Sequence, residues 1–118
     1  MKKLEFISNQ RWKVVFSDSP HWKAGVYVPE NRRLEDVRFL EKHNCPELFL
    51  LLEGEVFLVL GREGKIQVER MEEKRGYIVE EWHNAFGRGR VLVIERGEVK
   101  TEFKKVEEFQ LVKDSPDS

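Results

Sequence analysis

The chain has 118 residues, with 21 Lys and Arg against 22 Asp and Glu and a formal net charge of -1. This length suits one domain, and the even charge balance argues against a nucleic-acid or membrane-surface partner. The single cysteine, Cys45, excludes an internal disulfide and a multi-cysteine metal cluster. Charged residues make up 36% of the chain, a bias that resembles the composition of thermophile proteins.

The ends of the chain and its apolar segments bear on location. Residues 1–6 lack the long apolar run of a signal peptide, and no segment reaches the ~18 apolar residues of a membrane span. A lone cysteine is typical of a reducing compartment. These features predict a cytoplasmic protein.

Short runs of β-branched, aromatic and leucine residues recur in chain order, separated by turn residues. They predict strands at 12–16, 25–28, 37–41, 48–52, 56–60, 65–69, 77–79, 91–95, 99–103 and 109–112. Glycine-containing hairpin turns are expected at 53–55, 61–64 and 96–98. Residues 31–40 have no apolar stripe, and 104–108 allow at most a short helical turn. The pattern predicts one all-β sandwich or barrel domain over residues 1–112, followed by a flexible tail at 113–118.

Segments 48–52 and 56–60 are apolar at every position. A strand with one solvent face alternates apolar and polar residues, so both faces of these strands should be covered. In a sandwich of this size only one face of each sheet meets the core. We therefore expect a homodimer in which a second copy covers the other face, with cover by the N- or C-terminal segment as the alternative.

Polar residues lie at regular spacings among these strands. His43 precedes Glu47 by four residues, Glu47 precedes Gly54 by seven, and Trp82 and His83 follow later. These spacings resemble the two conserved motifs of the cupin superfamily, G(X)5HXH(X)3–4E(X)6G and G(X)5PXG(X)2H(X)3N, over about residues 35–96. The resemblance implies a jelly-roll barrel, also called a double-stranded β-helix.

Some motif positions hold other residues. In the first motif, Glu35 takes the place of the leading Gly and Glu41 that of the first His. In the second motif, Ile78, Glu80 and Gly87 take the places of the Pro, the Gly and the Asn. Residues two apart on a strand share a face, so Glu41 and His43 should point the same way.

The resemblance implies that the motif side chains converge inside the barrel. It indicates a divalent metal site made by His43, Glu47 and His83, with Glu41 as a fourth ligand. Imidazole and carboxylate ligands suit Fe, Mn, Ni, Zn or Cu, and the choice stays open. Trp82 and Phe49 are expected to line the pocket, with core packing as the alternative for both and the preferred one for Phe49.

The cupin superfamily includes dioxygenases, isomerases, epimerases, decarboxylases, storage proteins and sugar-binding regulatory domains, so the fold does not select an activity. Three hypotheses follow. The chain binds a metal and a small polar ligand, such as a sugar or an organic acid. Alternatively, it is a metal-free sugar isomerase or epimerase that uses His43 and His83 as general acid and base. The third hypothesis is a non-catalytic ligand-binding or sensing module.

Cys45, Glu80 and Glu81 are weaker candidates near the motifs, and two further residues, His21 and Trp12, are not expected in the site. Cys45 lies beside the proposed site, and a nucleophilic role would need a cationic neighbour that lowers its pKa; a buried bystander is the preferred interpretation. Of Glu80 and Glu81, strand alternation allows only one to face the pocket. His21 follows a turn signal and is expected to be exposed, whereas Trp12 is expected to pack near the N-terminal strands.

Overall fold

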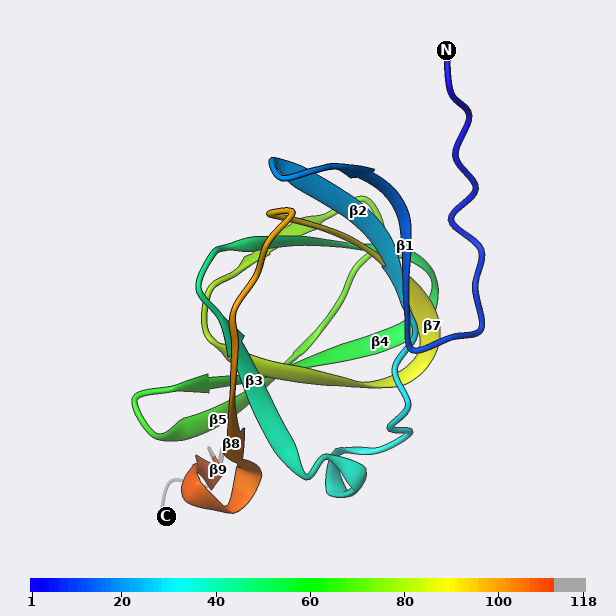
Figure 1. Cartoon of the computed structure of the whole chain (residues 1–118). Helices are drawn as coiled ribbons and strands as arrows, with labels where there is room; N and C mark the ends of the chain where they lie inside the picture. The colour runs from blue at the N-terminus through cyan, green and yellow to red at the C-terminus, as the bar shows by residue number, and fades with distance from the viewer. Residues whose placement is uncertain (112–118) are drawn as a thin grey trace.

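The computed structural model describes residues 1–111 and confirms the all-β prediction. A nine-stranded sheet curls on itself (Figure 1). Its strands are β1 (Trp12–Asp18), β2 (Trp22–Tyr27), β3 (Phe39–His43), β4 (Glu47–Arg62), β5 (Lys65–Arg70), β6 (Gly76–Val79), β7 (Trp82–Glu95), β8 (Thr101–Lys105) and β9 (Gln110–Leu111). Short 3-10 turns, η1 and η2, cover Leu34–Asp36 and Val106–Glu108. Val112 of the last expected strand and the expected tail at 113–118 lie outside the described residues.

The long strands β4 and β7 form the frame of the sheet. They pair antiparallel from Leu48 opposite Ile94 to Gly61 opposite Trp82. β2 and β3 pair with β7, while β5 and β6 pair with β4. Segments far apart in the chain therefore surround one interior, as Figure 1 shows. Within residues 1–111, no helix has the length and apolar character needed to cross a membrane.

The hairpin expected at 53–55 is wrong, because β4 runs straight through it. Gly54 lies within β4 at φ 84° and opposite Gly89 of β7, beside a register shift between Leu51 and Glu53. A Cβ atom on Gly54 would lie 2.3 Å from the carbonyl oxygen of Arg88. Glycine thus allows the two strands to approach and bend together, so it marks a corner of the curled sheet and not a chain reversal.

The other two expected hairpins have different outcomes. Glu63 and Gly64 have positive φ and connect β4 to β5, which pair antiparallel, so the turn at 61–64 is confirmed. The hairpin at 96–98 is wrong, because the next strand, β8, pairs with β3 and not with β7. The segment 82–90 was not expected to be a strand, yet it forms the first part of β7.

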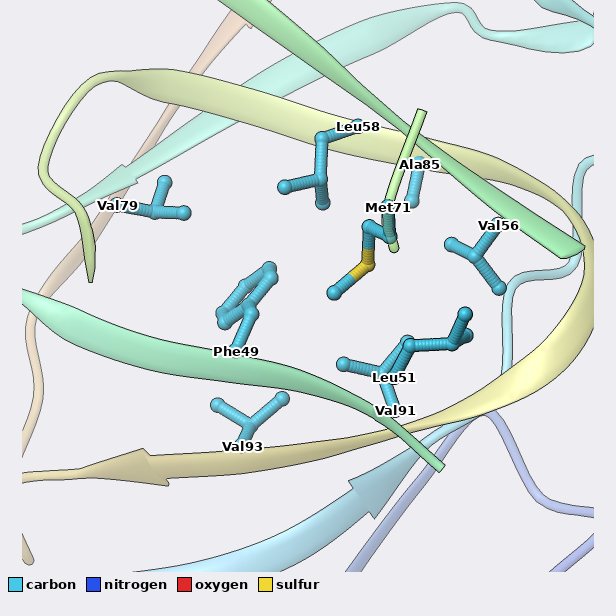
Figure 2. Packing of buried hydrophobic residues seen from close by; sticks show 9 residues of the cluster. All are labelled: Phe49, Leu51, Val56, Leu58, Met71, Val79, Ala85, Val91 and Val93. Carbon is cyan, nitrogen blue, oxygen red and sulfur yellow. The ribbon is translucent and has the colours of Figure 1, made fainter. Parts of the chain in front are cut away.

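Two apolar clusters pack on the strands. Figure 2 shows the main cluster, which consists of Phe49, Leu51, Val56, Leu58, Met71, Val79, Ala85, Val91 and Val93. The second consists of Val37, Leu40, Val59 and Ile66, with Leu34, Trp82, Phe86, Val106 and Phe109 packed against it. Val56 and Leu58 face the first cluster while Val59 faces the second. The chain itself therefore covers both faces of segment 56–60.

The segment 48–52 differs on its outer face. Leu48 and Leu50 are only half-buried, and Leu48 pairs with Ile78 of β6, which is 61% exposed. Only this half of β4 therefore has an apolar outer face that a second copy of the chain could cover. The dimer stays a prediction.

Candidate functional site

Three strands bring the four motif residues together. β3 supplies Glu41 and His43, β4 begins at Glu47, and β7 supplies His83, which lies opposite Glu41 in the sheet. The Oε1 atom of Glu47 lies 3.1 Å from Nε2 of His43 and 3.3 Å from Nε2 of His83. The Oε1 atom of Glu41 lies 3.5 Å and 3.9 Å from the same two nitrogens. Both imidazoles thus face the same two carboxylates.

The hydrogen bond of His83 defines its tautomer. Its Nδ1 lies 2.9 Å from the backbone carbonyl oxygen of Glu81. A carbonyl oxygen only accepts, so Nδ1 donates. Burial lowers the pKa of His83, which keeps the ring neutral near pH 7 and leaves Nε2 without a proton. This bare nitrogen is the atom that faces Glu47.

Glu47 is the most unusual group in the site. It is 4% exposed, and its Oε1 atom is buried with no hydrogen-bond partner among the described residues. Burial, and next the nearby carboxylate of Glu95, raise the pKa of Glu47 to about 9. A buried oxygen and a bare imidazole nitrogen at 3.3 Å repel each other unless a proton or a metal cation lies between them.

The spacing of these atoms fits a metal ion. Metal–ligand bonds of about 2.1 Å place neighbouring ligand atoms roughly 3.0 to 3.4 Å apart for octahedral or tetrahedral angles. The contacts of Glu47 with the two histidines, 3.1 and 3.3 Å, fall in this range. Candidate ligand atoms of Glu41, His43 and His83 all lie within 4.8 Å of one another. The donor set, two imidazoles with carboxylates, therefore suits a divalent transition metal.

The other two residues of the site have partners that orient them. Nδ1 of His43 lies 2.8 Å from the hydroxyl of Thr101, which lies opposite it on β8. This contact leaves Nε2 of His43 directed at the carboxylates. Burial opposes the ionisation of Glu41, but contact with His43 and the nearby basic groups His83 and Arg11 lower its pKa below the ordinary value. Glu41 is therefore an anion at neutral pH.

A pocket of about 270 Å³ lies over these residues. Besides the four motif residues, it is lined by Arg11, Trp12, Lys23, Tyr27, Phe49, Asn84, Ala85, Val93, Glu95, Val99 and Thr101. Lys23 and Glu95 face each other across β2 and β7, with Nζ 3.6 Å from the carboxylate. Glu95 also forms a second cluster of potential ligands with His43 and Glu47. Sequence reasoning missed Glu95, Lys23 and Thr101, because only strand register brings them to the motif residues.

Two expected pocket residues have different positions. Phe49 lines the pocket and belongs to the main apolar cluster, with its ring 5.6 Å from that of His83. Trp82 does not line the pocket; its ring packs 6.3 Å from Phe109, beside the second cluster. Because His83 faces inward, its neighbour on the strand must face the opposite way.

Cys45, Glu80, Glu81 and His21 lie outside the pocket, whereas Trp12 lines it. Cys45 is buried but is not among the lining residues. Glu81 forms an ion pair with Arg62, and Glu80 is exposed, so it is the backbone of Glu81 and not its side chain that serves the site. His21 is exposed, as expected.

Comparison with solved structures identifies the fold. A cupin-2 domain protein from Shewanella frigidimarina superposes with a TM-score of 0.56 at 15% identity, covering 77% of this chain and 84% of that one. Fe(II)-HppE with the alternative substrate (S)-1-HPP gives a TM-score of 0.57 at 16% identity, over 78% of this chain and 53% of that one. The DMSP lyase DddQ from Ruegeria pomeroyi gives 0.50 at 19% identity, over 73% and 43%.

This likeness shows the cupin jelly-roll fold that the motif spacing implied. The chain spans about half the length of HppE and less than half of the lyase. No family model matches the sequence, and no curated protein resembles it closely enough to match.

Proposed function

We propose that this cupin-fold chain binds one divalent metal ion through His43, Glu47 and His83, with Glu41 as a fourth ligand, and holds a small polar molecule in the pocket above it. One observation supports this most directly: the unpartnered, buried Oε1 of Glu47 faces the unprotonated nitrogen of His83 at 3.3 Å. Among proteins of similar fold, HppE has been crystallised with Fe(II) and with Co(II).

The residues of the chain prepare this centre. The carbonyl of Glu81 and the hydroxyl of Thr101 each contact the Nδ1 atom of one histidine, which directs both Nε2 atoms at the metal position. A bound metal would act there as a Lewis acid toward an oxygen of the pocket ligand. Trp12, Tyr27 and Phe49 also line the pocket, and their aromatic rings would shield a bound ligand from water.

The test is metal binding by protein purified without an affinity tag and stripped with a chelator. Calorimetric titration with Mn(II), Fe(II) under nitrogen, Ni(II), Zn(II) and Cu(II) should give about one site per chain. Metal at a hundred times its Kd should stabilise the fold by about 2.7 kcal/mol. His43→Ala and His83→Ala should weaken binding at least a hundredfold, because each removes a ligand.

The third histidine supplies the matched control. His21 is exposed and outside the pocket, so His21→Ala should bind metal like the wild type. Equal loss in His21→Ala, or a melting temperature that no metal raises, would refute the proposal.

A second candidate function is supported by the protonation state of the site. At neutral pH a protonated Glu47, with its pKa near 9, lies beside the neutral His83, an acid–base pair suited to a metal-free isomerase. This alternative predicts that sugar isomerisation or epimerisation persists in chelator-treated protein and is lost in His83→Ala. Binding of pocket ligands with no turnover by either the metal-loaded or the stripped protein would instead favour a sensing module.

A further inference from the structure

The charges of the pocket do not cancel once a metal is bound. A divalent ion is balanced by the carboxylates of Glu41 and Glu47, and Lys23 is paired with Glu95. Arg11 remains. It lines the pocket at an exposed position, and among residues 1–111 its guanidinium has no carboxylate within 4.0 Å and no hydrogen bond. We infer that the pocket ligand is a small organic monoanion, a carboxylate, that Arg11 holds while the metal binds its other polar end.

Three polar side chains of the pocket, Asn84, Tyr27 and Thr101, already have partners. Asn84 donates to the carbonyl of Phe39 at 2.8 Å, and its Oδ1 accepts from the amide of Ala85 at 2.8 Å and from the hydroxyl of Tyr27 at 3.4 Å. Thr101 is paired with His43. A sugar needs several free donors and acceptors, and this lining offers few. A carboxylate needs one guanidinium, which binds it in a two-pronged geometry.

The size of the pocket points to the same class of ligand. Its volume, about 270 Å³, lies just below the usual range of ligand pockets, about 300–1,000 Å³, and suits a small molecule. Apolar side chains, Phe49, Ala85, Val93 and Val99, form part of the wall and suit a short carbon chain. A three- to five-carbon acid with a hydroxyl or oxo group for the metal fits these limits.

This inference rests on the proposed metal centre, and the test separates the two. Protein loaded with Mn(II) and dialysed free of unbound metal is titrated with lactate, with lactamide and with glucose. Lactate and lactamide have nearly the same shape and differ in charge. We expect lactate to bind at least tenfold more tightly than either neutral compound, and its affinity to fall as NaCl rises from 50 to 500 mM because the rim of the pocket is open to screening.

Variants of Arg11 identify the group responsible. Arg11→Gln should weaken lactate binding at least tenfold while lactamide binding changes little, and Arg11→Lys should keep part of the affinity. Arg75→Gln is the matched control, since Arg75 pairs with Glu72 outside the pocket. Metal content is measured for each variant.

The outcomes are distinguishable. Bound Mn(II) with no binding of lactate, with equal affinities for lactate and lactamide, or with full lactate affinity in Arg11→Gln overturns the inference and leaves the metal centre intact. The last result would mean that the metal alone holds the acid. Failure of the wild-type protein to bind any of the five metals titrated above overturns the metal centre and the inference together.

Discussion

Replacing Glu47 by Gln should change how stability depends on pH. In the folded, metal-free chain the pKa of Glu47 is raised from 4.5 to about 9. Between these values the folded chain keeps a proton that the unfolded chain has lost, so the free energy of unfolding falls as pH rises. The whole interval corresponds to a ceiling of about 6 kcal/mol at 1.36 kcal/mol per unit. Water entry around the ionised carboxylate lowers this cost, and we expect a loss of about 2 to 3 kcal/mol from pH 5 to pH 9.

Gln has the shape of a protonated glutamate and does not titrate. In Glu47→Gln this part of the pH dependence should disappear, and at pH 8 the metal-free variant should be more stable than the metal-free wild type. The measurement is urea unfolding of chelator-treated protein at pH 5 to 9, in which the difference between the two curves removes contributions from all other groups. Metal should stabilise the wild type at pH 8 and leave the variant nearly unaffected.

Glu55→Gln is the matched control for this experiment. Glu55 lies on the same strand, but its side chain is 56% exposed and paired with Arg70. Its substitution should leave the pH dependence close to that of the wild type. Parallel pH profiles for the wild type and Glu47→Gln would show that this carboxyl does not hold a proton in the folded chain, and the account of the site would be wrong.

Three further predictions concern the corner, the orientation of His43 and the outer face. Gly54→Ala should destabilise the fold by about 2 to 4 kcal/mol in urea unfolding, because its Cβ meets backbone, whereas Gly64→Ala, also at positive φ but with open space around it, should cost about 1 kcal/mol. Thr101→Val should lower metal affinity about tenfold in calorimetric titration by removing the partner of His43 Nδ1, without loss of the fold. Light scattering should show a dimer that Ile78→Lys dissociates and that Phe103→Lys, at an exposed position on β8, leaves intact; a wild-type monomer at high concentration would contradict the prediction.

The all-β class could be predicted because the strand signal is local. Alternation, β-branched residues and glycine turns lie within a few residues of one another, and most expected strands are present. The corner at Gly54 could not be predicted in the same way. A glycine between two apolar runs is compatible both with a reversal of the chain and with a bend in one strand. The bend becomes evident only from Gly89, which faces Gly54 from β7, a strand that does not follow β4 in sequence.

The candidate metal ligands could be proposed from the sequence because the motif spacing reflects which residues meet in the fold. Glu41 and His43 share a strand face, and Glu47 begins the next strand. Strand alternation also predicts that the side chain of Trp82 lies outside the pocket. Because His83 faces the interior, alternation places the side chain of its neighbour, Trp82, on the opposite face of the strand, away from the pocket.

What the sequence could not supply is the chemical state of the site. The proton position on His83 follows from a carbonyl at a turn, and the orientation of His43 from a hydroxyl on β8. The raised pKa of Glu47 follows from burial and from Glu95 at the far end of β7. None of these partners has a motif of its own, because each is placed by the register between distant strands. Candidate ligands can thus be proposed from spacing, whereas their protonation and orientation depend on the neighbours that the fold provides.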